Sequence, residues 1–448
     1  MGLPLAQKVS RIRILQPLVS RDFRLLFVGQ SVSLFGDQFY LVALPLLILD
    51  LTGSGLVLGT VLMLGGISRA AFDLVGGALS DNVSQKLILF NSNIARAVIT
   101  ALITVIAFCS TTQLWHLYVL SVGFGIVDAF FYPAFLAIIP KLIDRDQLTG
   151  GNALMRGTAR LMGSVGPAAA GLVIAGVGGA AVSSANTNTG DGHRFATSFA
   201  IDTATFIFAA ATVWAMKESR TPVNRENGQE SNHHNRVGSI AIGALLSSIR
   251  DGLAYAWRDR LIRSLMLFIA IIEFSFIGPS TIGLALLAKT RFAQGTLETR
   301  AAAPYAAMLS SFGFGMLAGM ILAGSLRPTR HKGRLIISTM CLLGLGTAAL
   351  GFVPQVWEAC AIVFVIGLIG GLLNITLLAW IQSRCEPQRL GRVLSVVMFG
   401  TSLVEPASYA LSGILADISL RLLFVASAVL ILGTALGSFA EPSIMTTE

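Results

Sequence analysis

The sequence predicts an all-α membrane protein with twelve transmembrane helices in two six-helix halves and with both termini in the cytoplasm. Of its 448 residues, 54% are hydrophobic and only 12% are charged, whereas soluble proteins carry about 25% charged residues. Apolar stretches recur from end to end, and a stretch of about 20 apolar residues is long enough to span a bilayer core. Basic residues gather on alternate connections between these stretches, which is the pattern of a multi-pass protein.

The predicted spans form two sets of six on either side of a polar centre. The first set covers residues 25–49, 55–79, 87–109, 115–140, 153–177 and 197–216. The second set covers residues 264–287, 303–324, 335–353, 358–381, 393–415 and 420–440. The domains that follow are a cytoplasmic N-terminal arm, a first bundle, a cytoplasmic linker, a second bundle and a cytoplasmic tail, over residues 1–24, 25–216, 217–263, 264–440 and 441–448.

The positions of lysine and arginine set the orientation of the spans. The predicted cytoplasmic side holds the basic N-terminal arm with Lys86, Lys141, Arg145, Arg327, Arg330, Lys332, Arg334, Arg384, Arg389 and Arg392. The opposite side holds only Arg194, Lys289, Arg291, Arg300 and Arg421. Because short cytoplasmic loops collect lysine and arginine, the net charge of +9 indicates topology rather than a nucleic-acid partner. The stretch from Lys289 to Arg300 is more basic than an outer connection should be, and the sequence gives no reason for it.

The linker between the bundles changes character along its length. Asn224 to Arg236 is rich in asparagine, glutamate and histidine and is typical of a flexible segment. After Gly238, apolar residues recur every four positions, at Leu245, Ile249, Leu253 and Trp257. This spacing predicts an amphipathic helix that lies on the inner membrane face.

Signatures of several other functional classes are missing from the sequence. It contains no Gly-x-x-x-x-Gly-Lys-Ser/Thr loop for ATP. The four cysteines, Cys109, Cys341, Cys360 and Cys385, have no metal-ligand spacing. No nucleophile elbow or pair of catalytic carboxylates stands out. We therefore expect neither an enzyme nor a primary pump, and no cofactor or metal.

Ionisable residues inside the predicted spans are the strongest functional signal. Each charge at the bilayer centre costs about 2.5–3.5 kcal/mol on insertion scales. Arg69 and Asp73 lie four positions apart on one helix and are expected to pair. Four acids have no opposite charge nearby in the sequence and are the candidate proton sites: Asp37, Asp128, Glu273 and Glu405. For each of them the alternative is a buried structural hydrogen bond. Arg96 lies in the third span, and Asp202 lies nearer the outer end of the sixth.

Two further motifs concern helix packing and the inner face. In the fifth span, Gly163, Gly166, Pro167 and Gly171 predict close packing and a bend, with Pro406 as the counterpart in the eleventh. Glu405 precedes that proline, so we expect it to link protonation to bending. Between the second and third spans, Gly77, Asp81 and Lys86 form a polar turn. Together with Gly391 and Arg392 before the eleventh span, this turn is expected to latch the inner face.

These motifs resemble a known family. Gly77, Leu79, Asp81 and Lys86 resemble the loop after the second span in the major facilitator superfamily, although Asn82, Ser84 and Gln85 depart from the usual pattern. The fifth-span motif is similar to that of superfamily antiporters. The segments Phe27–Gln30, Ser33–Asp37, Leu44–Leu46, Asp128–Pro133, Ile139–Pro140, Asn152–Leu154 and Gly391–Val393 resemble the macrolide-efflux-like branch of the drug:proton antiporters. Many antiporters of the superfamily carry an arginine in the fourth span. That span has none here, so Arg69 or Arg96 is expected to take its place.

The resemblance implies the major facilitator fold and a proton-driven exporter of amphipathic organic compounds, such as drugs or macrolides, that works by alternating access. We expect a monomer in a bacterial inner membrane whose partners are the substrate, protons and lipid. Asp37 and Glu273 are expected to face a central cavity, with Tyr40, Phe131, Tyr132 and Trp380 either contacting the substrate or serving as packing and interfacial anchors. The alternatives are a siderophore exporter, a lysophospholipid flippase and a transport-dead membrane sensor.

Overall fold

The computed structural model describes residues 13–183, 190–217, 260–293, 301–325, 332–384 and 387–439. The first helices are η1 (Arg13–Val19), α2 (Arg21–Thr52), α3 (Gly55–Asn82), α4 (Gln85–Phe108), α5 (Leu114–Leu142), η2 (Arg145–Gln147), α6 (Leu148–Ser183) and α7 (Gly190–Trp214). They are followed by α9 (Arg260–Gly278), π-helical η3 (Pro279–Gly283), α10 (Leu284–Leu287), π-helical η4 (Ala288–Phe292), α11 (Ala302–Ser325), α12 (Lys332–Leu350), α13 (Val356–Arg384), α14 (Pro387–Ile418) and α15 (Leu420–Phe439).

Within the described ranges, ten helices are long and apolar enough to cross a membrane. Each of them overlaps one of the predicted spans, while α12 and α14 overlap the ninth and eleventh predicted spans without belonging to the ten. Most of the predicted linker, including its amphipathic helix, falls at residues 218–259, outside the described part of the chain. Residues 1–12 of the predicted arm and the tail beyond residue 439 also lie outside it.

The turn between α2 and α3 illustrates how the sequence sets the ends of these helices. Gly53 has φ 68°, the left-handed conformation that glycine adopts without strain, and its N–H donates to the Leu49 carbonyl at 2.7 Å. Ser54 follows as the N-cap of α3, and its hydroxyl accepts a hydrogen bond from the Val57 N–H at 3.2 Å. The polypeptide therefore reverses direction in two residues, and the N-terminus of α3 is left at the end of the bundle.

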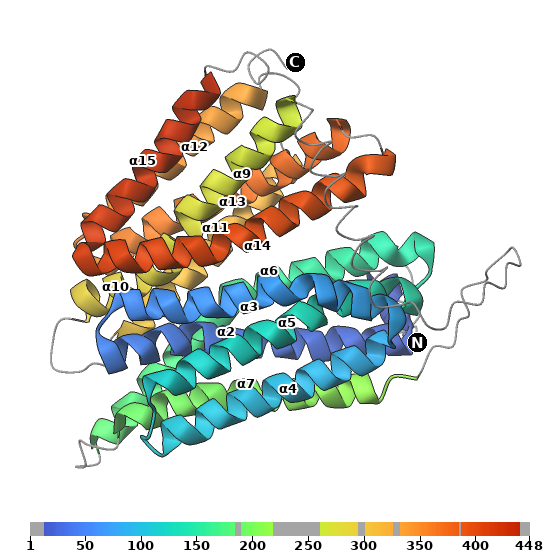
Figure 1. Cartoon of the computed structure of the whole chain (residues 1–448), viewed down its shortest axis with the longest axis horizontal. Coiled ribbons are helices and arrows are strands. Elements are labelled where there is room, and N and C mark those ends of the chain that lie inside the picture. Colours follow the sequence, from blue (N-terminus) through green and yellow to red (C-terminus); the bar gives the residue numbers. More distant parts are fainter. Residues whose placement is uncertain are drawn as a thin grey trace, which may run out of the picture.

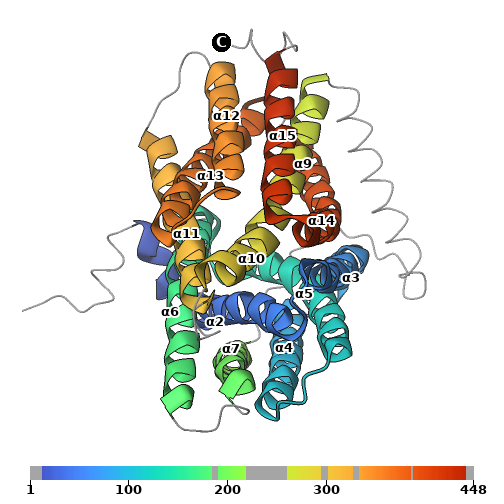
Figure 2. The same ribbon diagram turned by 90° about the vertical axis from the view of Figure 1, so that its left-hand side faces the viewer.

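The helices lie in two groups, α2–α7 and α9–α15, which Figures 1 and 2 show from two sides. The groups contact each other chiefly where α3 packs on α14 and α6 packs on α11. A side chain at Gly59 of α3 would collide with the backbone carbonyl of Tyr409 in α14. The two helix backbones approach this closely because no Cβ intervenes. In Figure 1 the groups converge at the end that holds α10 and splay apart toward the opposite end.

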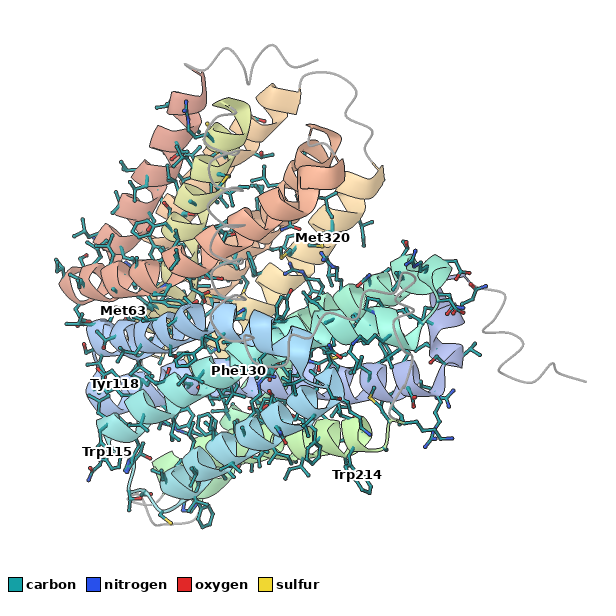
Figure 3. All side chains as sticks on the ribbon, turned by 45° about the vertical axis from the view of Figure 1, so that its right-hand side comes forward. Met63, Trp115, Tyr118, Phe130, Trp214 and Met320 are labelled. Atoms are coloured by element: carbon teal, nitrogen blue, oxygen red, sulfur yellow. The ribbon has the colours of Figure 1, made fainter. Side chains whose placement is uncertain are left out.

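The outer surface of the described helices has the character of a lipid-facing surface. Large apolar side chains lie fully exposed on several helices, among them Leu172 at 72% and Ile321 at 72%. Trp115 and Trp214 lie at opposite ends of the first helix group (Figure 3) and are also exposed, at 57% and 72%. Tryptophan is enriched at both membrane–water interfaces, so their separation marks the two edges of a bilayer.

Candidate functional site

A cavity of about 480 Å³ lies between the two helix groups. Its walls come from α2, α3, α4, α5, α6 and α14. The polar lining residues are Gln30, Asp37, Tyr40, Arg69, Arg96, Ser121, Asp128, Tyr132, Asn152, Arg156, Glu405 and Tyr409. Most of the other lining residues are leucines and phenylalanines together with Ile139 and Met155. A mainly apolar cavity with a few convergent polar groups is the usual form of a small-molecule site.

Helix α2 brings Asp37 to the cavity by its periodicity. Gln30, Leu34, Asp37, Leu41 and Leu44 are spaced three or four apart, and all of them line the cavity. Among the described residues, Asp37 has no ion pair and no hydrogen-bond partner. The charges that act on it include those of Arg96 and Asp128. Asp37 is therefore an acid that reaches the cavity without a fixed donor.

Unlike Asp37, Asp128 has a fixed partner, because Arg96 of α4 forms an ion pair with it. The guanidinium also lies over the Phe131 ring, 3.9 Å from its centroid, and its side chain is only 7% exposed. The sequence had suggested that Asp128 has no basic neighbour, since Arg96 is 32 residues away in the chain. Arg96 thus lies beside the fourth predicted span and lines the cavity. Its role in place of the missing arginine of that span stays a prediction.

Glu405 lines the cavity from the second helix group. The Tyr409 hydroxyl donates to its Oε1 at 2.9 Å, and the neighbouring Pro406 packs against Gly66 of α3. Arg69 lines the cavity too, but no ion pair within 4 Å joins it to Asp73 in the described structure. Arg69 is nevertheless the main opposite charge that acts on Asp73.

Glu273 of α9 is not among the residues that line this cavity. Its electrostatic neighbours are Glu405 and Arg160, and the Arg160 guanidinium lies 3.1 Å from the sulfur of Met316 in α11.

Of the predicted aromatic contacts, Tyr40, Phe131 and Tyr132 line the cavity. Tyr40 also stacks on Phe124, with ring centroids 4.9 Å apart. The side chain of Trp380 lies outside what the structure describes.

The end of the bundle that holds α10 is sealed by two carboxylates, and we call it the closed end. Asp417, next to the last residue of α14, accepts hydrogen bonds from the Ser54 hydroxyl at 2.6 Å, the Gly55 N–H at 2.5 Å and the Leu56 N–H at 3.2 Å. It thus joins the second helix group to the N-terminus of α3, where the helix dipole favours a negative charge.

Asp50, near the end of α2, makes the second contact of the closed end. It forms ion pairs with Arg194 of α7 and with Lys289 of η4, the latter at 2.9 Å. Lys289 also donates to the Leu49 carbonyl at 2.5 Å, while Arg291 donates to the carbonyls of Gly351 and Val353. These contacts account for Lys289 and Arg291 in the basic stretch that the sequence left unexplained, while Arg300 lies outside the described residues. The sequence did not indicate a role for Asp50 or Asp417, because acids are common at helix ends.

Nearly the whole chain matches a profile of a known family, the transmembrane secretion effectors, over residues 12–441. The chain belongs to this family. Transmembrane secretion effectors are transporters of the major facilitator superfamily, so the protein is a multi-pass membrane transporter and not an enzyme.

Two curated relatives of this transporter are efflux proteins. Macrolide efflux protein A of Streptococcus pyogenes is 24% identical over 401 residues, which cover 88% of this chain and 89% of the relative. Multidrug efflux pump Tap of Mycolicibacterium fortuitum is 26% identical over 393 residues, which cover 85% and 86%. The predicted likeness to the macrolide-efflux-like branch is thereby confirmed, at low identity.

Solved structures share the fold. A bacterial homolog of the human lysosomal transporter Spinster, in an inward-facing and unoccupied conformation, has a TM-score of 0.71 at 14% identity, with 95% of this chain and 97% of that chain covered. The nucleoside transporter NupG has a TM-score of 0.67 at 13% identity, with 94% and 99% covered. At these identities the likeness concerns the major facilitator fold alone.

The fifth-span motif of this transporter contributes to packing on both sides of α6. Gly166 packs against Gln38 of α2, and Gly171 packs against Ala302 and Ala306 of α11. The motif therefore touches both helix groups. The bend expected at Pro167 and Pro406 stays a prediction.

The predicted inner latch is only partly within the described structure. Lys86 donates to the Met216 carbonyl at 2.5 Å, a contact inside the first helix group. A side chain at Gly77 would meet open space, whereas one at the neighbouring Gly76 would collide with the Ala129 carbonyl of α5. The side chains of Asp81 and Arg392 and the surroundings of Gly391 are outside the described part, so the latch stays a prediction.

Proposed function

We propose that this transporter is a proton-driven exporter of amphipathic organic compounds, such as drugs or macrolides, and that it works by alternating access. The observation that carries the proposal is the cavity between the helix groups, into which Asp37 projects without a fixed partner. An acid buried at membrane depth is costly and is kept where it serves transport. We further propose twelve spans, cytoplasmic termini and a monomer in a bacterial inner membrane.

The chemistry of the cavity supports an amphipathic substrate. Its volume of about 480 Å³ lies in the range of ligand sites, roughly 300–1,000 Å³. Phenylalanine, tyrosine and leucine side chains supply apolar contact, while Asp37 and Glu405 attract a basic group such as the amino sugar of a macrolide. The printed names of the two efflux relatives agree with this class of substrate.

The two ends of the bundle support alternating access. Asp417 and Asp50 join the helix groups at the closed end, and Figure 1 shows the groups splaying apart at the other. We infer that the conformation is inward-facing, because the closed end is the one that the charge pattern places outside. Export then requires the closed-end contacts to break while the predicted latch at Gly77, Asp81, Lys86, Gly391 and Arg392 forms.

The proposal is tested with inverted membrane vesicles that contain the full chain. We expect ethidium and a fluorescent macrolide to accumulate when the lumen is acidic, and accumulation to stop when nigericin collapses the gradient. D37N should lower the rate about tenfold, which corresponds to about 1.4 kcal/mol in the barrier to transport. The matched control is D146N, because Asp146 is an exposed acid in η2.

Transport that is unaffected by nigericin would reject proton coupling. A protein that moves neither probe would favour a transport-dead sensor. The susceptibility and metabolite-release profiles of a deletion strain separate drug export from the siderophore and lysophospholipid alternatives. An unchanged drug profile together with a retained siderophore or lysophospholipid would reject the drug exporter.

A further inference from the structure

Asp202 is a buried acid that the cavity does not explain. It lies at the middle of α7, is 0% exposed and is absent from the residues that line the cavity. Within the described residues, neither of its carboxyl oxygens has a hydrogen-bond partner. The nearby Thr205 hydroxyl donates to the backbone carbonyl of Asp202 at 2.8 Å. From the sequence, Asp202 is expected nearer the outer end of the sixth span and is not a candidate proton site; the structure puts it at the centre of α7.

Asp202 lies directly behind the part of α2 that carries Asp37. A Cβ atom at Gly36 would be 2.9 Å from the Asp202 Oδ1 and would collide with the Thr205 hydroxyl. The absence of a side chain at Gly36 therefore makes room for the carboxyl group. Asp37 is the next residue on α2 and lines the cavity, so the two acids lie beside the same short segment of α2.

Three helices pack against α7, and the charged groups on each can be named. Asp37 and Tyr40 act on Asp202 from α2, and Arg96 acts on it from α4. On α6, Arg156 lines the cavity and Arg160 contacts Met316, so neither is directed at α7. Arg96 is already paired with Asp128, although its Nε atom is buried and has no partner in the described structure.

This environment disfavours an ionised carboxylate at Asp202. Burying a charged carboxylate is strongly unfavourable unless donors or a paired cation surround it. Among the described residues, the one hydroxyl that acts on this carboxyl group, that of Thr205, already donates to the Asp202 backbone carbonyl, and the nearby cation, Arg96, is paired with Asp128. A neutral carboxyl group, with its proton bound, fits the site far better.

We propose that Asp202 is a second proton-binding group of the transporter, which exchanges its proton with Asp37 across the gap at Gly36. When Asp37 has released its own proton into the cavity, the O–H bond of Asp202 breaks and an O–H bond forms on Asp37. The negative charge thereby moves from Asp37 to Asp202, beside Arg96. This inference rests on the proposed proton-driven export, which it extends from one acid to two.

The first test reads the protonation of Asp202 directly, in the purified full chain. The infrared carbonyl band of protonated carboxylic acids is recorded at neutral pH for the wild type, D202N and D202E. We expect D202N to remove one band and D202E to shift it, whereas S198A, a neighbouring buried hydroxyl variant, leaves it unchanged. An unaltered band in D202N would mean that Asp202 is ionised and would overturn the proposal. Thermal unfolding confirms that each variant is folded before its spectrum is used.

The second test measures coupling in the vesicle assay. We expect D202N to lower the rate of gradient-driven ethidium accumulation about tenfold, while ethidium affinity, from fluorescence titration in detergent, changes less than twofold. D202N that pumps at the wild-type rate would reject the proposal and leave the exporter intact. A wild type that fails to respond to the gradient would reject proton-driven export, and the infrared band would still report on Asp202. If D202N does not fold, G36A, which crowds the gap but keeps both acids, takes its place and should show the same loss of rate.

Discussion

The closed end and the interior of this transporter hold the same kind of residue in opposite states. At the closed end, Asp50 and Asp417 are saturated with donors from Arg194, Lys289 and the start of α3. In the interior, the described residues include no ion pair of Asp37 and no hydrogen-bond partner within 3.5 Å of either carboxyl oxygen of Asp202. The comparison teaches that the partners of an acid indicate its role. The acids with fixed partners hold helices together, and we propose that those without them change protonation.

The largest effect is expected from breaking the most buried pair, with D50N. The Arg194 side chain is 2% exposed, and removing one partner of a buried ion pair costs about 3–5 kcal/mol. We expect the free energy of unfolding in detergent to fall by that amount. The control is E358Q, since Glu358 is an acid in the first turn of α13 with no described contact to the first helix group. Equal stability of D50N and E358Q would contradict the structural role of Asp50.

A smaller effect is expected from D417N, which weakens the contact between α14 and α3. Hydrogen bonds to a charged group are worth about 1.5–3 kcal/mol, so the closed end should open more often. In a cysteine-free background, a reporter cysteine at Leu286, which contacts Gly55, measures this opening. Its labelling by an external impermeant thiol reagent should quicken about tenfold or more, as 1.4 kcal/mol is tenfold. Labelling at the E358Q rate would show that Asp417 does not seal this end.

Glu405 lies between the two kinds of acid, those with fixed partners and those without. Glu405 lines the cavity and yet accepts one hydrogen bond, from Tyr409. We expect E405Q to slow proton-driven export with an energetic effect of about 1.5 kcal/mol if its protonation is linked to the bending of α14. Y409F tests the hydrogen bond alone and should cost less, about 0.5–1.5 kcal/mol. Unchanged export by E405Q would place Glu405 with the structural acids.

The smallest effect is expected at the predicted latch, with D81N. An acid near a helix N-terminus contributes about 0.3–1 kcal/mol, so turnover should slow about two- to fivefold. Substrate affinity, measured by fluorescence titration, should change less than turnover, because the latch acts on the conformational change. Equal losses in the two quantities would argue against a latch.

Apolar stretches predicted the positions of the helices, because each stretch lies within one continuous segment of the sequence. Positions three or four apart on α2 share a face, so a single helix contains the information. Contacts between helices were not accessible in this way. Arg96 and Asp128 are 32 residues apart, and Lys289 and Asp50 are 239 apart. Such pairs depend on which helices become neighbours. The same holds for Asp202, because the helices that become neighbours of α7 determine whether its carboxyl oxygens meet a hydrogen-bond donor.

The chemical nature of the donors at the start of α3 bears on how this protein tolerates mutation. Of the three hydrogen bonds that the Asp417 carboxylate accepts, two come from peptide N–H groups, those of Gly55 and Leu56. Every amino acid except proline carries that group, so nearly all replacements at residue 56 preserve the donor. This contact therefore depends on the side chain of Asp417 and on the backbone at the start of α3, so it survives most changes at position 56 but not the loss of the carboxylate in α14.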